Sequence, residues 1–242
     1  MINKKIIVAV DVNEISKAKT LVNELLPYAA GFKVGLEILT SEGSPAVISA
    51  MPKGAPIFFD AKFSDIPNTV AGAMRGVVKH GAWMTTIHTM GGLEMMRVAK
   101  EASLAEALKL GRTPPLVMGV TVLTSLNAES LTRIGIPTDD GRVSDAVVKL
   151  ALLAKEAGLD GVISSPKEIE AIRKECGSNF LIVTPGIRPA WAATNDQKRV
   201  MTPREAIDAG ANFLVIGRPV TNPPVEIGSP ANAIQKIMEE CA

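Results

Sequence analysis

The sequence predicts an α/β protein built as one (β/α)8 barrel. Short apolar runs alternate with segments of helical periodicity, there are eight such runs, and polar residues follow most of them directly. This alternation is typical of parallel strands joined by crossover helices. Eight units in 242 residues fit a closed barrel better than an open doubly wound sheet. We expect a single domain over residues 1–242, because no linker or low-complexity stretch divides the chain.

The expected strands are short and apolar, and the expected helices carry apolar residues three or four positions apart. Strands are expected near 5–10, 32–36, 57–59, 83–88, 116–122, 159–163, 180–184 and 212–216. Helices are expected at 14–26, 67–80, 91–109, 142–157, 166–175, 203–209 and 229–240. Aromatic residues make up only 4% of the chain, so Ala, Val, Ile and Leu supply most of the core.

Composition argues against several classes of partner. The chain has 26 basic and 25 acidic residues without a long run of one sign, so neither nucleic acid nor an anionic membrane is expected. Cys176 and Cys241 form no disulfide framework, which favours a reducing cytoplasm. The apolar run before Asp11 is too short for a signal peptide, and no segment approaches the roughly 18 apolar residues of a membrane helix.

Polar residues gather where the expected strands end, which is where the active sites of (β/α)8 barrels lie. From the first strand to the eighth, without the sixth, they are Asp11, Lys33, Asp60 with Lys62, His88, Thr124, Arg188, and Gly217 with Arg218. One shared pocket accounts for all of them.

The third strand presents Asp60, Lys62 and Asp65 within six positions. Alternation along a strand points Asp60 and Lys62 the same way, and the break at Pro67 lets Asp65 turn back toward a pocket. Two carboxylates would then hold Lys62 as a charged proton donor, which suits general acid chemistry on a carbanion. Alternatively, Asp60 and Lys62 form an exposed strand-end ion pair and Asp65 caps the following helix.

Gly217 and Arg218 follow the eighth strand, where such barrels commonly bind phosphate. The alternative is a glycine turn beside a surface arginine. Residues 186–200 lack clear periodicity and are expected to form a lid in which Gln197 closes over the phosphate. Alternatively, they form a surface loop whose Trp191 covers a neighbouring residue.

The sequence gives no sign of a metal or cofactor. His80 and His88 are the only histidines, and neither is predicted to be catalytic. No His/Cys/Asp/Glu group has the spacing of metal ligands, and no Gly-x-Gly-x-x-Gly or Walker sequence is present. Any chemistry is therefore expected to come from side chains.

The chain resembles the orotidine 5'-phosphate decarboxylase family, in its shorter bacterial form, over nearly its whole length. The most specific motif is 59–69, Phe-Asp-Ala-Lys-Phe-Ser-Asp-Ile-Pro-Asn-Thr. Segments 8–11, 32–35, 120–124, 183–188, 196–197 and 215–218 support it in order, and the resemblance is loosest at 190–195.

The resemblance implies a cofactor-free decarboxylation of orotidine 5'-phosphate to UMP. Lys62 would protonate C6 of the pyrimidine, Asp60 would lie against the substrate carboxylate, and Lys33 would orient the charged array and bind the ribose. Asp65, Ile66 and Thr69 would reach the site of the partner subunit in a homodimer. Further substrate contacts are implied for Asp11, Thr124, Pro185, Arg188, Gln197, Gly217 and Arg218.

Two other functions remain open. Metal-dependent sugar-phosphate enzymes of the same barrel family, such as 3-keto-gulonate phosphate decarboxylase and hexulose phosphate synthase, share Asp-x-Lys-x-x-Asp. They carry an acidic metal ligand where this chain has Lys33, and the Ile66-Pro-Asn-Thr69 continuation also favours the metal-free enzyme. A noncatalytic barrel that senses UMP is the other alternative. Such a protein would not need the four charged residues Lys33, Asp60, Lys62 and Asp65.

Overall fold

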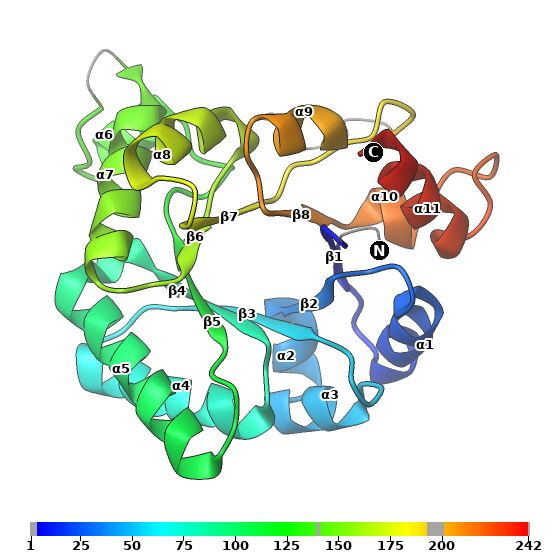
Figure 1. The fold of residues 1–242 in the computed structure, drawn as a ribbon, viewed down its shortest axis with the longest axis horizontal. Coiled ribbons are helices and arrows are strands. Elements are labelled where there is room, and N and C mark those ends of the chain that lie inside the picture. The colour runs from blue at the N-terminus through cyan, green and yellow to red at the C-terminus, as the bar shows by residue number, and fades with distance from the viewer. Residues whose placement is uncertain (1–3, 139–140, 193–200, 242) are drawn as a thin grey trace.

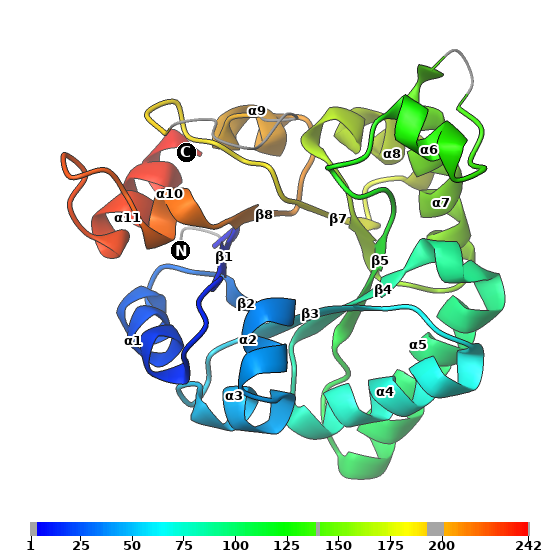
Figure 2. The ribbon, with the colours of Figure 1, turned by 180° about the vertical axis from the view of Figure 1, so that it is seen from behind.

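Eight parallel strands close into a barrel in the order of the chain, β1 to β8. The structure is a computed structural model, and it describes residues 4–138, 141–192 and 201–241. Helices surround the ring of strands on all sides, as Figure 1 shows from one end and Figure 2 from the other. The predicted (β/α)8 barrel is confirmed. In the described part of the chain, no helix is both long and apolar enough to span a membrane.

All eight strands lie close to the predicted positions. They are β1 Ile6–Ala9, β2 Gly31–Gly35, β3 Ile57–Phe63, β4 Met84–His88, β5 Leu116–Val120, β6 Gly161–Ile163, β7 Leu181–Thr184 and β8 Phe213–Ile216. The largest difference is in β3, which continues four residues beyond the predicted end at 59 and includes the charged residues of the motif.

The seven predicted helices are present, and several short ones were missed. The predicted helices are α1 Ile15–Leu25, α4 Pro67–His80, α5 Gly92–Leu110, α7 Val143–Glu156, α8 Ile169–Cys176, α9 Pro203–Asp208 and α11 Pro230–Glu240. The helix predicted at 166–175 begins as the 3-10 turn η3 Pro166–Glu168 and continues as α8. The missed segments are α2 Leu36–Ser41, α3 Ser44–Ala50, α6 Ala128–Arg133, α10 Arg218–Thr221 and the 3-10 turn η1 Thr89–Gly91. These segments are too short to display a helical repeat.

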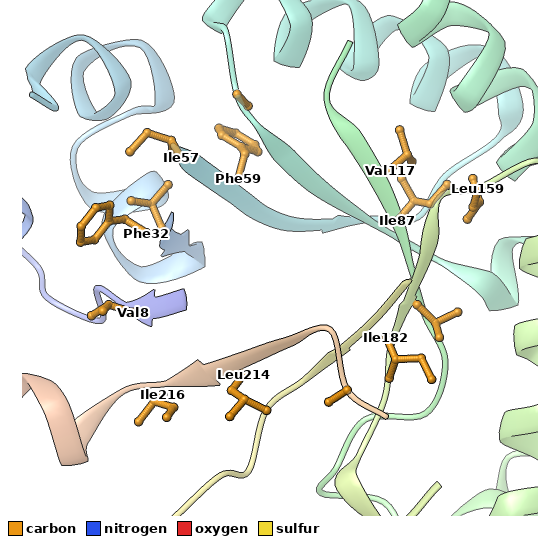
Figure 3. Packing of buried hydrophobic residues seen from close by; sticks show 14 of the residues in the cluster. Val8, Phe32, Ile57, Phe59, Ile87, Val117, Leu159, Ile182, Leu214 and Ile216 are labelled. Atoms are coloured by element: carbon orange, nitrogen blue, oxygen red, sulfur yellow. The ribbon is translucent and has the colours of Figure 1, made fainter. Parts of the chain in front are cut away.

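Alternation along the strands divides the core into two layers. The layer between strands and helices includes Val8, Phe32 and Phe59, which Figure 3 shows with their neighbours. The interior of the barrel is filled by Ile7, Ala9, Phe58, Met84, Met118, Val183 and Val215. A residue two positions beyond an interior residue is expected to face the interior too, so the strand pattern directs Asp60 and Thr86 inward near the barrel mouth.

The amino-terminal ends of β7 and β8 are joined by Arg173 of α8. Its guanidinium donates to the carbonyl oxygens of Phe180 at 2.8 Å and Gly210 at 2.6 Å, and to Asn212 Oδ1 at 2.9 Å. Asn212 Oδ1 also accepts the amide of Ile182 in β7 at 2.9 Å. One side chain therefore connects a helix to two strands.

Candidate active site

The pairing of β3 with β4 is irregular where the motif begins. Phe59 pairs with Thr85 and Phe63 with Ile87, so the three β3 residues between them stand opposite Thr86 alone. Such a bulge bends the strand and redirects its side chains. The motif is therefore carried by a bulge and not by a regular strand.

Lys62 lies within this bulge with φ at +52°, and no other non-glycine residue in the described ranges has a positive φ. Its Nζ approaches Asp60 Oδ2 to 2.7 Å. Regular alternation was therefore the wrong reason for expecting these two side chains to meet. They meet because the backbone turns at Lys62.

A chain of ion pairs runs across three neighbouring strands. Lys33 Nζ of β2 lies 3.6 Å from Asp60 Oδ2 and 2.9 Å from Asp11 Oδ1, which follows β1. With Lys62, the order is Asp11, Lys33, Asp60, Lys62, and the signs alternate. The side chain of Asp60 is only 8% exposed, whereas that of Asp11 is 59% exposed. The buried carboxylate is compensated by two ammonium groups, so the exposed ion pair envisaged as an alternative is not what forms.

Asp65 does not join this array within one chain. It is exposed, its Oδ1 accepts the amide of Ile66 at 2.6 Å, and no ion pair among the described residues joins it to Lys62. The prediction that Asp65 turns back to bracket Lys62 is therefore wrong for the single chain. The helix-cap alternative also fails, because the cap position of α4 is Ile66 and makes no side-chain cap hydrogen bond. Ile66 is 67% exposed and Thr69 is exposed too.

Two adjoining cavities open at the barrel mouth, and they share Lys33, Pro185 and Val215. The first, of about 220 Å³, contains Asp60, Lys62 and Thr124. Its remaining lining is mostly apolar and consists of Phe58, Val120, Val122, Leu123, Ile163, Ser164 and Ser165. The first cavity therefore combines charged groups with a largely apolar lining.

The second cavity, of about 180 Å³, is the more polar of the two. It contains Asp11, Arg188, Gly217 and Arg218. A Cβ added to Gly217 would lie 3.5 Å from the Cβ of Ala9 and 3.7 Å from Asp11 Oδ2, so this glycine leaves room at the cavity wall. With Lys33 at the shared boundary, three cationic side chains face this space. Such a lining suits a phosphate.

Only part of the predicted lid can be placed. Gln197 lies outside the described residues, as do residues 193–200 as a whole. Before that gap, Arg188 is 8% exposed and its amide donates to the carbonyl oxygen of Met201 at 3.0 Å. Lys236 Nζ lies 5.9 Å from the ring centroid of Trp191, so this tryptophan does cover a neighbouring side chain.

The chain that forms these two cavities is similar to known proteins over most of its length. The model of the family described as "Orotidine 5'-phosphate decarboxylase / HUMPS family" matches residues 4–236. This chain belongs to the orotidine 5'-phosphate decarboxylase / HUMPS family. The resemblance read from residues 59–69 is confirmed.

Named relatives of this family cover almost the whole chain. The chain is 50% identical over 236 residues to the orotidine 5'-phosphate decarboxylase of Moorella thermoacetica, covering 97% of this chain and 92% of the relative. It is 47% identical over 238 residues to that of Syntrophomonas wolfei, covering 98% and 97%. The crystal structure of the Lactobacillus acidophilus orotidine 5'-phosphate decarboxylase superposes with a TM-score of 0.83 at 33% identity, covering 98% of this chain and 99% of that one.

Near the site of this orotidine 5'-phosphate decarboxylase / HUMPS member lie His88, expected at a strand end but not as a catalyst, and Thr86, which was not predicted at all. Burial lowers the pKa of His88 at the end of β4, the charge of Lys62 lowers it further, and Asp60 opposes both. Thr86, two residues earlier, is fully buried and contacts both Asp60 and Lys62. Nothing in the sequence marks this threonine, since its position depends on the bulge in β3.

No metal site is evident in the described ranges of this family member. No group of three or more His, Cys, Asp or Glu side chains there is placed to hold an ion. The expectation of a metal- and cofactor-independent reaction stays a prediction.

Proposed function

We propose that the protein decarboxylates orotidine 5'-phosphate to UMP and carbon dioxide, the last step of de novo pyrimidine synthesis. The observation that carries the proposal is the alternating row Asp11, Lys33, Asp60, Lys62, which lines two adjoining cavities, in a chain closely similar to enzymes of that name. The protein is then a carboxy-lyase.

Lys62 is the proposed general acid. When the bond between C6 and the carboxyl carbon breaks, its electron pair stays on C6, in an orbital that the ring π system cannot delocalise. The Lys62 ammonium donates a proton to C6, and the amine is reprotonated from solvent. A cation fixed beside the carbon where charge develops stabilises the transition state more than the ground state.

Asp60 and Lys33 set the position of that acid. Asp60 holds the Lys62 ammonium at 2.7 Å. In this proposal Asp60 would lie against the substrate carboxylate. Lys33 lies within 4 Å of both Asp60 and Asp11, so it can orient the row and bind the ribose together with Asp11. An ammonium at position 33 supports a metal-independent reaction, because Mg²⁺ requires oxygen ligands.

The rest of the substrate would occupy both cavities. The pyrimidine would lie against Thr124 and Pro185, and the 5'-phosphate beside Arg188, Gly217 and Arg218. Gln197, which lies outside the described residues, is assigned to the phosphate by the family resemblance alone. Rate enhancements of very slow reactions correspond to barrier reductions on the order of 23 kcal/mol. Binding a phosphate far from C6 is one source of that energy, since it can stabilise the closed site in the transition state.

We further propose a cytoplasmic homodimer. Ile66 is a large apolar side chain left 67% exposed, and Asp65 and Thr69 on either side of it are exposed too. In the dimer these residues would complete the site of the partner subunit, where Asp65 would join the charged array beside Lys62. The lack of an intrachain partner for Asp65 beyond the Ile66 amide, among the described contacts, is consistent with this role.

The decisive experiment follows the loss of orotidine 5'-phosphate ultraviolet absorbance in the presence of EDTA. The wild type is expected to convert the substrate rapidly. Lys62→Ala should lower kcat by about 10⁴-fold, the upper end for a general acid, because removing it also leaves the Asp60 carboxylate with one fewer cation. Lys19→Ala, which changes an exposed lysine on α1, is the matched control and should keep full activity.

Other outcomes would contradict the proposal. If turnover required Mg²⁺ and a sugar phosphate in place of the nucleotide, the protein would belong with the metal-dependent enzymes of the family. If UMP bound tightly but no substrate was consumed under either condition, the protein would be a nucleotide sensor.

A further inference from the structure

The hydroxyl of Thr86 connects Asp60 and Lys62, two neighbouring members of the charged array. Thr86 lies in β4 and is fully buried, and its Oγ1 donates to Asp60 Oδ1 at 2.9 Å. The same oxygen accepts the backbone N–H of Lys62 at 2.9 Å. Thr86 is not among the residues that line the cavity, so it can act only through its two partners.

The bulge explains why a side chain is needed at this point. Three residues of β3 stand opposite Thr86 alone, so the regular ladder of main-chain hydrogen bonds is interrupted there. The Lys62 amide instead finds its acceptor in the Thr86 hydroxyl. This bond holds Lys62 at φ +52°, a conformation that residues with a Cβ seldom adopt.

The two hydrogen bonds also fix the direction of the hydroxyl. An amide can only donate and an ionised carboxylate can only accept, so the one hydroxyl proton must point to Asp60. The two carboxylate oxygens of Asp60 therefore have different partners. Oδ1 accepts from Thr86, and Oδ2 faces the ammonium groups of Lys62 and Lys33.

We propose that Thr86 is a positioning residue that sets the backbone of Lys62 and the rotation of the Asp60 carboxylate together. This inference rests on the proposed decarboxylase function. Thr86 does not touch the substrate. Its loss should therefore lower kcat while leaving the contacts that bind phosphate and ribose in place.

The test compares Thr86→Val with Thr85→Val. Both changes remove a buried hydroxyl from neighbouring positions of β4, but Thr85 Oγ1 donates to the carbonyl oxygen of Phe59 and not, within the described residues, to the charged array. Thr86→Val should lower kcat for orotidine 5'-phosphate by about 10- to 100-fold. KM and the Kd for UMP should change by less than about 3-fold. Thr85→Val should lose thermal stability and keep kcat within about 3-fold.

A second pair of variants keeps the inference testable if valine at position 86 prevents folding. Thr86→Ser and Thr86→Ala both lack the methyl group and differ only in the hydroxyl. Serine should restore kcat to within about 3-fold of the wild type, whereas alanine should show the full loss.

The activities of the wild type and the variants distinguish failure of the decarboxylase function from failure of the Thr86 positioning role. If the wild type does not decarboxylate orotidine 5'-phosphate, the proposed function fails and the role of Thr86 fails with it. If the wild type is active and both Thr86→Val and Thr86→Ala keep kcat, only the positioning role is overturned. It is also overturned if the serine and alanine variants lose kcat equally, or if Thr85→Val loses kcat as much as Thr86→Val.

Discussion

Asp60 is the residue through which most of the candidate site is connected. Its carboxylate meets Lys33 and Lys62 through one oxygen and Thr86 through the other, at 8% side-chain exposure. A buried charge is stable in a protein only when cations or hydrogen-bond donors surround it. The site is therefore preorganised before any substrate enters, with its charges balanced by one another.

At the same scale, Arg218 gives a prediction about phosphate binding. Arg218→Ala should raise KM for orotidine 5'-phosphate by about 10- to 100-fold, since a hydrogen bond to a charged group contributes about 1.5–3 kcal/mol. Steady-state kinetics measure this change. The control substrate is orotidine, which has no phosphate, and its kcat/KM should be the same for variant and wild type. Equal losses with both substrates would place Arg218 away from the phosphate.

The sequence could predict which residues gather at the site but not how they are held there. Asp11, Lys33, Asp60 and Lys62 stand at strand ends, and the structure brings all four together. The left-handed backbone of Lys62 could not be predicted, because no glycine or asparagine marks it. Its conformation depends on a pairing register with β4, which is a long-range property.

At the scale of elements, α8 provides a test of stability away from the active site. Arg173→Ala removes hydrogen bonds to Phe180, Gly210 and Asn212 and leaves partly buried acceptors without their donor. Urea unfolding should show a loss of about 2–4 kcal/mol. Arg204→Ala is the matched control, because Arg204 is exposed and pairs with Asp208 at i,i+4, so its loss should cost less than about 0.5 kcal/mol.

The same variant separates stability from chemistry. Arg173 lies at the amino-terminal ends of β7 and β8, and the array lies at the opposite ends of the strands. The kcat of folded Arg173→Ala should therefore equal that of the wild type. A fall in kcat without a loss of unfolding free energy would contradict this separation.

The elements that the sequence predicted well are those with a long enough repeat. α4 and α5, of 14 and 19 residues, display several helical turns, whereas α2 and α10 have 6 and 4 residues. For β3, the apolar run ended at 59, and the polar residues that continue the strand could not be told from a loop. Their place in the strand follows from pairing with β2, where Gly35 stands opposite Asp60.

At the scale of the molecule, the count of strand units sufficed to predict the barrel, but one chain could not supply the whole predicted array. Asp65 lies on the surface, at the start of α4, and its proposed place is in a second copy of the chain. Neither that dimer nor the single domain over 1–242 follows from the fold of one chain, and both stay predictions.

Mixed dimers test the shared site. Lys62→Ala and Asp65→Ala chains should each be nearly inactive alone. When they are mixed after reversible dissociation, half of the dimers should be hybrids, and each hybrid should contain one intact site. Recovered activity should approach about one quarter of that of the wild type per total site, measured by absorbance. No recovery, with mixed dimers shown to form by mass spectrometry, would contradict the assignment of Asp65 to the partner site.

The bulge in β3 limits how this chemistry could be transferred to another barrel by design. Installing Asp, Lys and Asp at matching positions of a regular strand would point the lysine toward a different place, since three residues here occupy the space opposite one. A graft would have to include two inserted residues and a hydroxyl on the next strand. A designer would therefore have to transfer the distorted pair β3 and β4 as a whole, because the charged side chains alone would not reproduce the geometry.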